Sequence, residues 1–200
     1  MLIYAHNYYK NHNLFAINQF YAFIKNNYIV ETTKNMDKLN VPKRYLPKIL
    51  TSRDLAKQKR ELRKSRKLYK KGKYYSRKTV KSFHSKPSKH IEHARKIYKI
   101  DTITPSAQLA EKTQCSQDAL EKIVNKGRGA YYSSGSRPNQ TAESWGLARL
   151  ASSITAGNSS AIDYSVLEDG CSPKSKALKL AKKCLSLKRR GKSCNAHLEK

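Results

Sequence analysis

The chain has 200 residues, 38% of them hydrophobic, and a formal net charge of +28 at pH 7. This length suits one domain, or one small domain with arms, and the low apolar content excludes a large core. Because so large a charge repels itself in a compact state, we expect an anionic partner: nucleic acid, an acidic protein surface or lipid headgroups. The first residues lack the pattern of a secretory signal peptide.

The charge is distributed in three blocks. Residues 43–99 hold 22 Lys and Arg against three acids, a net of +19. Residues 100–172 hold six basic and eight acidic residues, and residues 173–192 hold nine basic residues and no acid. The near-neutral block is where a core forms most easily, whereas we expect the basic blocks to order only against a partner. The predicted segments are an N-terminal arm or leader at 1–40, a basic helical and extended arm at 41–99, a near-neutral helical core domain at 100–172, and a basic C-terminal helix and tail at 173–200.

Residues 1–35 differ from the rest, because they are rich in Asn, Tyr, Ile and Phe and carry little charge. Two interpretations stay open: a sticky N-terminal arm, or a leader that precedes the true start of translation at Met36. The apolar-rich run at 14–24 is too short to span a bilayer. We expect this run to pack on a partner as a helix and, as a weaker alternative, to lie on a membrane surface.

A basic helix is predicted between Thr51 and Gly72. Thr51 and Asp54 form a capping-box pattern at its start, and the glycine ends it after about Lys71. The apolar residues of this helix recur every seven positions and leave Lys and Arg on the remaining faces: Leu55, Leu62 and Tyr69. This density of positive charge favours a helix that faces an anion over a helix that is only solvated.

Aromatic residues follow this helix and alternate with cations. The aromatic residues are Tyr74, Tyr75 and Phe83, and the cations are Arg77, Lys78 and Lys81. Rings beside cations suit stacking on nucleic-acid bases, and they also suit protein interfaces. A further helix is expected at 88–98.

A helical hairpin is predicted at 104–126. Pro105 suits the first position of a short helix, Ser116 can cap the next one, and Gln114 stands at the turn between them. The pattern is similar to a helix-turn-helix, although that turn usually holds Gly. The second helix also carries Asp118 and Glu121, whose carboxylates are poorly suited to contact with phosphates and base edges. We therefore expect a helical hairpin and favour it over a DNA-reading motif.

Residues 127–141 form the densest motif of the chain, GRGAYYSSGSRPNQT. Its glycines, hydroxyls and arginines predict a Gly/Ser loop. One interpretation is a polar loop that satisfies its own hydrogen bonds and docks aromatic residues in the core. The other is a cradle whose backbone N–H groups hold a phosphate. The first interpretation is favoured, and the segment is neither a Walker loop nor a dinucleotide-binding motif.

Three more helices are expected after this loop, at 142–155, at 161–168, and from Ser172 and Pro173 to about Arg190. The last one is basic and amphipathic, which suits a membrane surface, nucleic acid or an acidic protein. The predicted fold class is mainly α: a small helical domain, made of the helical hairpin, the Gly/Ser loop and the following helices, with extended basic arms.

Four cysteines are widely spaced, and none forms a CxxC pair: Cys115, Cys171, Cys184 and Cys194. Cys194 and His197 form a lone CxxH pattern, and His90 and His93 form an HxxH pattern, but no further ligand completes a tetrahedral zinc site. We therefore expect no metal and surface histidines. Reduced, mostly buried thiols are favoured, with a disulfide left open.

Several segments between residue 41 and about residue 183 form a specific pattern. They are KKGKYYSR at 70–77, KSF at 81–83, SKH at 88–90, GRGAYYSSGSRPNQT at 127–141 and SWGLARLAS at 144–152. In these segments the chain resembles an uncharacterised protein family of large double-stranded DNA viruses of algae and amoebae, the nucleocytoplasmic large DNA viruses. The resemblance implies a virus-encoded protein and implies no particular activity.

The function favoured at this point is a non-enzymatic structural component of a virion, made in the host cytoplasm. We expect a minor capsid protein that binds and cements shell subunits from inside through its basic arms. Its partners would be the major shell protein and other minor proteins, with viral DNA or inner-membrane headgroups as alternatives. The second hypothesis is a DNA-binding protein that condenses or packages the genome by neutralising phosphates. An enzyme acting on nucleic acid is least favoured, because no catalytic constellation is present, and neither a cofactor nor a small-molecule substrate is expected.

The candidate residues for binding an anion or a protein partner come from the basic helix, from the segment after it and from the 127–141 motif. They are Arg60, Arg63, Lys64, Arg66, Lys67, Lys70, Lys71, Lys73, Arg77, Arg128, Ser134 and Arg137.

Overall fold

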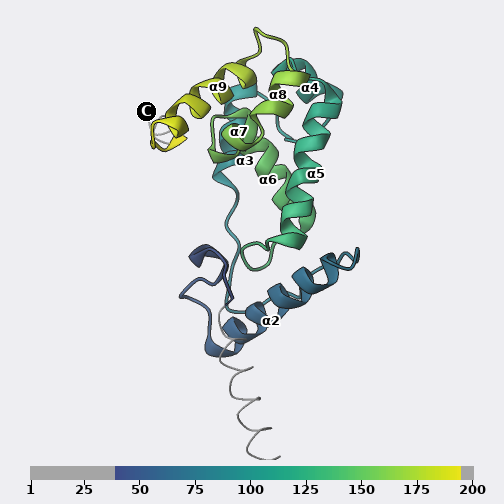
Figure 1. The fold of residues 1–200 in the computed structure, drawn as a ribbon, viewed down its shortest axis with the longest axis vertical. Helices are drawn as coiled ribbons and strands as arrows, with labels where there is room; N and C mark the ends of the chain where they lie inside the picture. Colours follow the sequence, from purple (N-terminus) through teal and green to yellow (C-terminus); the bar gives the residue numbers. More distant parts are fainter. Residues whose placement is uncertain (1–38, 195–200) are drawn as a thin grey trace, which may run out of the picture. The chain divides into compact units, whose positions relative to one another are not determined.

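The computed structural model describes residues 39–194, and in this part of the chain the protein is mainly helical (Figure 1). Contacts divide the chain into two units, 1–40 and 41–200, and the fold described below is that of the second. The elements are η1 (Lys43–Tyr45), α2 (Ser52–Tyr69), α3 (Lys89–Tyr98), α4 (Ala107–Thr113), α5 (Gln117–Ser133), α6 (Ala142–Ile154), α7 (Asn158–Ile162), α8 (Tyr164–Gly170) and α9 (Lys176–Arg189). The predicted fold class, a mainly helical small domain, is confirmed. The predictions on residues 1–35, on Met36 and on His197 lie outside the described residues.

Side-chain caps determine where several helices begin. The hydroxyls of Thr51, Ser106, Ser116 and Ser175 each accept a hydrogen bond from the backbone N–H three residues later. The predicted caps at Thr51 and Ser116 are therefore confirmed. The predicted capping box at Thr51 is only half formed, because the Asp54 carboxylate binds Ser82 and the Thr51 N–H donates to the Ser82 hydroxyl. The predicted helix starts at a proline were wrong, because α4 begins after Ser106 and α9 begins after Ser175. The helix expected at 161–168 is two short helices, α7 and α8.

Helices α5 and α6 form the centre of the unit and run side by side (Figure 1). They cross at two glycines: a Cβ on Gly127 would lie 2.6 Å from the Cα of Gly146. This crossing corrects the prediction of a loop at 127–141. Residues 127–133 belong to α5, because the glycine that suggested a loop is needed where the two helices touch. Only residues 134–141 connect α5 to α6.

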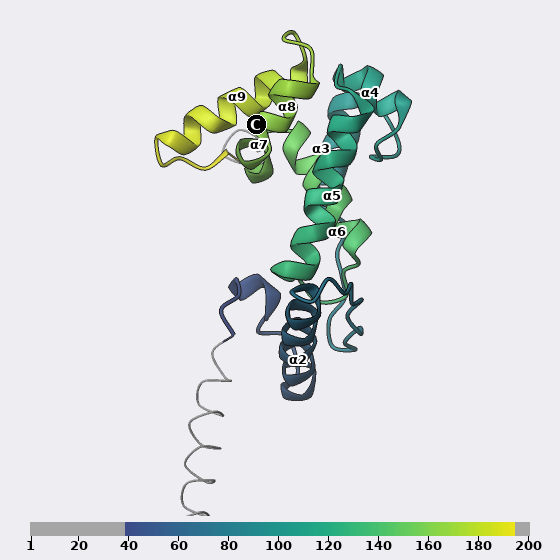
Figure 2. The same ribbon diagram turned by 45° about the vertical axis from the view of Figure 1, so that its right-hand side comes forward.

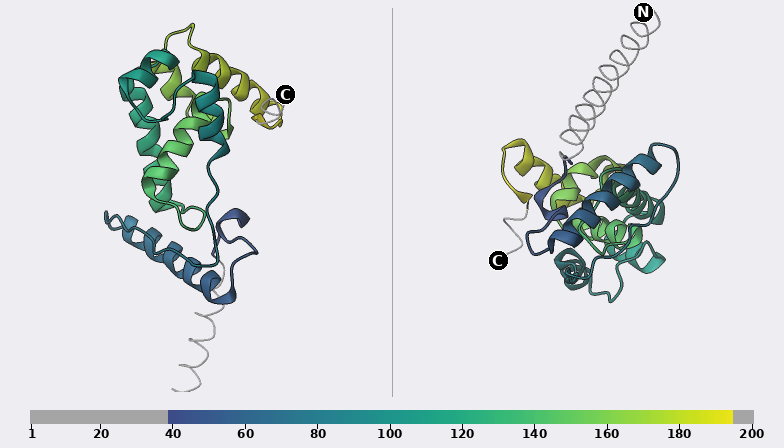
Figure 3. Two further views of the ribbon diagram at one scale, coloured as in Figure 1. Left: turned by 180° about the vertical axis from the view of Figure 1, so that it is seen from behind. Right: turned by 90° about the horizontal axis from the view of Figure 1, so that it is seen from below.

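The hydrophobic core collects side chains from all three charge blocks of the sequence. Helix α3 packs on α6 (Figure 3), and it contributes Tyr98, whose hydroxyl donates a 2.7 Å hydrogen bond to the Ile154 carbonyl. Helix α9 contributes Ala177 and Ala181. The largest contribution comes from the hairpin, α6 and α8, through Leu109, Leu120, Ile123, Val124, Leu150, Ala151, Ile154 and Leu167. The two basic blocks are thus integrated in the fold, and the expectation that they order only against a partner does not match this packing.

Two disulfides, one between distant segments and one between neighbouring segments, crosslink the described part of the chain. Cys115 is bonded to Cys171, which ties the turn before α5 to the connection after α8, and Cys184 is bonded to Cys194. Two backbone hydrogen bonds flank the first bridge, from Ser116 N–H to the Gly170 carbonyl and from Ser172 N–H to the Gln114 carbonyl. The favoured expectation of reduced thiols was therefore wrong. Closing loops of 56 and 10 residues stabilises the fold by about 4 and about 3 kcal/mol in the chain-entropy model.

Helix α2 lies against the C-terminal end of α5 (Figure 2). Its buried residues are Gln58, Glu61, Leu62 and Ser65, which recur at helical spacing on one face. The Gln58 amide donates hydrogen bonds to the carbonyls of Tyr45 and Ser136, and the Ser65 hydroxyl donates to the Tyr132 carbonyl. One face of α2 is therefore fixed to the body of the unit, and the opposite face is left to solvent.

No helix among residues 39–194 is long and apolar enough to cross a membrane.

Candidate functional site

The solvent side of α2 and of the turn that follows it carries a row of cations. Going along the helix, successive members are separated by three, four or seven residues, so they share one face. We define the α2 basic face as the exposed residues Arg53, Arg60, Lys64, Lys67 and Lys71. A helix of 18 residues is about 27 Å long, so this face presents positive charge over most of the width of a small domain.

The two acidic residues of α2 are both turned away from this face and satisfied by neutral donors. Asp54 accepts hydrogen bonds from the backbone N–H and the hydroxyl of Ser82, at 2.8 and 2.7 Å. Glu61 accepts from the Tyr75 hydroxyl and the Lys78 backbone N–H, both at 2.9 Å. The hydrogen bonds from Ser82 hold the pKa of the Asp54 carboxyl below its usual range. The α2 basic face is therefore not neutralised by acids of its own helix.

Arg77, a predicted anion-binding residue, binds other groups of the same chain. Its guanidinium donates hydrogen bonds to the Ser65 hydroxyl at 3.0 Å, the Tyr131 carbonyl at 2.8 Å and the Ser136 hydroxyl at 2.7 Å. It also lies 3.6 Å from the centre of the Tyr131 ring, an attractive cation–π geometry. Burial lowers the pKa of this guanidinium, but an arginine keeps its charge at pH 7. Arg77 thus joins α2 to the end of α5.

Most of the polar groups that suggested an anion cradle at 127–141 have partners within the fold. Arg128 forms ion pairs of 2.7 Å with Glu121 and with Glu143, so its charge is balanced on the surface of α5 and α6. The Ser134 carbonyl accepts a 2.8 Å hydrogen bond from Arg66 of α2. Asn139 binds the chain at 80–83, accepting from the Val80 N–H and donating to the carbonyls of Val80 and Phe83. The interpretation of a segment that docks its aromatic residues and satisfies its own polar groups fits these contacts.

The predicted site residues therefore separate into groups. Six are exposed on α2 or the turn after it: Arg60, Lys64, Lys67, Lys70, Lys71 and Lys73. Arg63 and Arg66 are half-buried at the edge of the helix, and Arg137 is exposed on the 134–141 connection near His90. Sequence reasoning missed Arg53, which its spacing of seven residues from Arg60 places on the same face.

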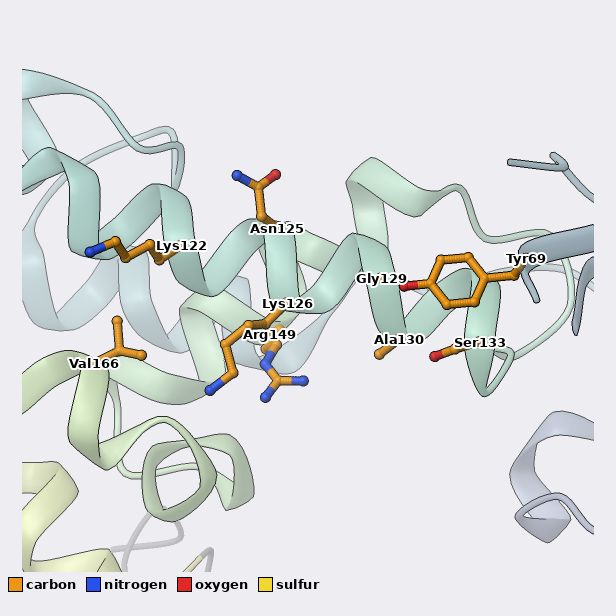
Figure 4. Close-up of a pocket in the computed structure, with 9 residues that line it drawn as sticks. All are labelled: Tyr69, Lys122, Asn125, Lys126, Gly129, Ala130, Ser133, Arg149 and Val166. Atoms are coloured by element: carbon orange, nitrogen blue, oxygen red, sulfur yellow. The ribbon is translucent and has the colours of Figure 1, made fainter. Parts of the chain in front are cut away.

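A shallow groove runs along α5, beside the end of α2 (Figure 4). One face of α5 lines it, together with Tyr69, Arg149 and Val166. Figure 4 shows Lys126 and Arg149 close together at its centre. Both cations bind Asp163, which is fully buried: the Lys126 ammonium lies 2.8 Å from one carboxylate oxygen, and the Arg149 guanidinium donates to both oxygens at 2.7 and 2.8 Å.

The two cations at the centre of this groove therefore share one carboxylate, which balances one of their two charges. Burial alone would raise the pKa of Asp163, but hydrogen bonds from Arg149, Lys126 and Ser153 outweigh it and hold that pKa below the usual range. The Asp163 carboxylate, between two cations, joins α5, α6 and the α7–α8 connection. It is a structural ion pair and offers no proton to a reaction at pH 7.

The histidines and cysteines form no metal site in residues 39–194, where no group of three His, Cys, Asp or Glu side chains converges. Cys194 is held in a disulfide, so its thiolate is not available as a ligand. Burial, with the neighbouring cations Lys96 and Lys176, lowers the pKa of His93. Burial, with His93 and Arg137, lowers the pKa of His90, so the surroundings favour the neutral form of both imidazoles.

Residues 42–165 match a protein family described as a family of unknown function, DUF5824. The chain belongs to this family. No curated protein and no solved structure matches the chain significantly. The DUF5824 region contains the whole of the α2 basic face, the Arg77 contacts and the 127–141 motif, whereas α9 and the second disulfide follow it.

Proposed function

We propose that this DUF5824 protein is a non-enzymatic component of a large DNA virus virion and that it binds the phosphate backbone of nucleic acid. The observation that carries the proposal is the α2 basic face. Five exposed cations lie on one side of α2 and the turn after it, and both acids of the helix face inward. The viral part of the proposal is supported by the resemblance to proteins of large DNA viruses.

The composition of the face favours nucleic acid over a protein partner. The centres of protein–protein interfaces are depleted in Lys and enriched in aromatic residues, Met and Arg. Three of the five members of the α2 basic face are Lys and none is aromatic, and Ala56 is the uncharged exposed residue between its first two members. Cations in a row along a helix are suited to neutralising successive phosphates, with release of counterions.

The geometry also favours binding without recognition of base sequence. Long flexible lysines placed along an exposed helix can follow a backbone, but the motif similar to a helix-turn-helix does not present a cationic reading helix. Its second helix, α5, pairs Glu121 with Arg128 on its surface. We therefore expect binding that depends on phosphate number and salt, with little dependence on base sequence.

The test is salt-dependent binding of the full chain to a random 20-base-pair duplex. A variant in which the five residues of the α2 basic face are replaced by Gln should reduce the magnitude of the slope of log K against log salt by about 4.5, because each lost phosphate contact removes about 0.9. A matched control replaces five exposed lysines of the C-terminal block by Gln, for the same change in charge: Lys174, Lys179, Lys182, Lys183 and Lys188.

The control variant should keep most of the salt slope and the affinity of the unmodified protein. An unmodified protein whose affinity does not change with salt would contradict the proposal. Equal losses in the two variants would also contradict it, because binding would then follow net charge and not the α2 basic face.

A second candidate function is the minor capsid protein that cements shell subunits. Two disulfides in a small chain favour it, because disulfides persist on virions and in other oxidising surroundings. Here the anionic partner would be an acidic surface of a shell protein. Gentle disruption of virions followed by nuclease treatment separates the two candidates: a capsid protein stays with the shells, and a genome-binding protein is released when the DNA is degraded.

A further inference from the structure

The turn after α2 places an aromatic residue among exposed cations. The N–H groups of Gly72 and Lys73 donate hydrogen bonds to the carbonyls of Tyr69 and Leu68, and Gly72 has a φ of +71°. This is the glycine-dependent ending that lets a chain reverse at the end of a helix. Because the chain reverses here, Tyr74 returns to a position beside Tyr69, at 6.1 Å between ring centres.

Tyr74 is exposed to an unusual degree for an aromatic residue, at 73% of its surface. Two other large apolar side chains of the described region are comparably exposed, Ile49 and Ile162. Tyr74 differs from both because three exposed lysines belong to the same turn: Lys70, Lys71 and Lys73. Lys71 is also the last member of the α2 basic face.

The rings of Tyr69 and Tyr132 pack against the Tyr74 ring. The centre of the Tyr132 ring lies 5.1 Å from that of Tyr74 in an edge-on arrangement, and it lies 6.3 Å from that of Tyr69 with the two planes nearly parallel. Tyr132 is held in turn by Tyr131, at 5.0 Å between centres. The Tyr74 ring is therefore held in a three-ring cluster by Tyr69 of α2 and Tyr132 of α5.

We propose that Tyr74, on the support of Tyr69 and Tyr132, stacks on an unpaired base, so that this end of the α2 basic face binds single-stranded nucleic acid. The inference rests on the proposed function and specifies its ligand. Proteins that bind single strands without sequence preference combine a cationic track with aromatic rings that stack on bases. A base paired inside a duplex is already stacked on both sides, so only an unpaired base can use the Tyr74 ring.

The experiment compares three fluorescent probes of equal length at equal salt with the full chain. These are a 15-nucleotide deoxythymidine strand, an abasic strand with the same phosphates, and a duplex. The unmodified protein should bind the thymidine strand about tenfold more tightly than the abasic strand, the size expected for one stacked base. Tyr74→Ala should abolish this difference, and Tyr74→Phe should preserve it because stacking needs the ring and not the hydroxyl.

Ile162→Ala serves as the control, because it removes a similarly exposed apolar side chain on α7. It should leave all three affinities unchanged. The duplex affinity of Tyr74→Ala should stay within twofold of the unmodified protein, and a thermal melt should show that each variant folds.

Several outcomes would overturn the inference. Equal binding of the abasic and thymidine strands by the unmodified protein would exclude base stacking, as would a Tyr74→Ala variant that weakens all three probes alike. Binding of a poly-glutamate peptide with the same dependence on Tyr74 would assign the ring to an acidic protein. The proposed function survives the first two outcomes if the duplex still binds through the α2 basic face, whereas failure of every nucleic-acid probe would end both.

Discussion

Residues 127–141 hold the most distinctive sequence of the chain, whereas the outer face of α2 is a plain repeat of Lys and Arg. In the structure the distinctive segment supplies packing. It holds a glycine at the α5–α6 crossing, a tyrosine under Arg77 and an asparagine that binds residues 80–83. The plain repeat supplies exposed cations. A dense motif is thus no guide to the exposed cations of a surface when most of its polar groups already have partners in the fold.

We expect substitutions in these two regions to affect different properties of the protein. Substitutions in or against the 127–141 segment should change the free energy of unfolding and leave nucleic-acid binding intact, once the variant is folded. Substitutions on the α2 basic face should do the opposite. Three of the following four changes test the first half of this expectation, and Asp163→Asn tests the ion pair of the neighbouring Lys126. They are given in order of decreasing effect.

Arg77→Ala should destabilise the unit by about 4 kcal/mol, because it leaves three acceptors without their charged donor and removes a cation–π contact. Arg77→Lys should recover less than half of this loss, since an ammonium cannot match the forked geometry. Urea unfolding followed by circular dichroism measures both. Lys78→Ala, at the exposed neighbouring position, is the control, and a stable Arg77→Ala with weakened duplex binding would assign Arg77 to the binding surface instead.

Asp163→Asn should cost about 3 kcal/mol at pH 7, because it leaves Lys126 and Arg149 without the carboxylate they share. The pKa of Asp163 is lower in the fold than in the unfolded chain, so its contribution is complete above about pH 3.9 and is lost as the pH falls through the lower, folded value. The difference in unfolding free energy between the two proteins should therefore shrink below pH 4. A difference that stays constant down to pH 2 would contradict this assignment.

Gly127→Ala should destabilise by about 2 kcal/mol, because the new Cβ would meet the Gly146 backbone at 2.6 Å and force the two helices apart. Gly129→Ala is a matched control two residues away in the same helix. Its Cβ would meet the Tyr69 hydroxyl at an ordinary contact distance of 3.6 Å, so this change should be neutral or should stabilise α5 by up to about 1 kcal/mol. Thermal melts of the two variants show whether the close helix crossing or general helix propensity determines the change in stability.

Arg128→Ala should change stability by less than about 1 kcal/mol, because its pairs with Glu121 and Glu143 lie on the surface, with 43% and 51% of the acidic side chains exposed. Duplex affinity should also change by less than twofold, although a positive charge is removed, because two acids already surround it. A large loss of duplex affinity would show that the 127–141 segment takes part in binding after all.

Local signals carried most of the fold prediction. The hydroxyl of Thr51 and the positive φ of Gly72 mark the two ends of α2, and the cap at Ser116 marks the start of α5. These features act over three or four residues, so a sequence displays them directly. The same reasoning placed Arg60, Lys64, Lys67 and Lys71 on a cationic helix.

Contacts over long sequence distances could not be predicted in this way. Arg77 meets Tyr131 and Ser136 only after the chain folds, and Cys115 meets Cys171 across 56 residues. Gly127 was misinterpreted for a related reason. A glycine has the same local signature in a loop and at a close crossing of two helices, and the partner that distinguishes the two, Gly146, is distant in sequence.

The inward carboxylates of α2 have a consequence for how the protein responds to ionic strength. Asp54 and Glu61 hold the 75–82 segment through two hydroxyls and two N–H groups, donors that carry no charge, so salt weakens this attachment little. The repulsion among the outer cations does depend on salt, and it is greatest in dilute buffer. Adding salt should therefore release a bound polyanion and at the same time make the free protein more resistant to heat, and the shift in melting temperature caused by a polyanion should be largest where the free protein is least stable.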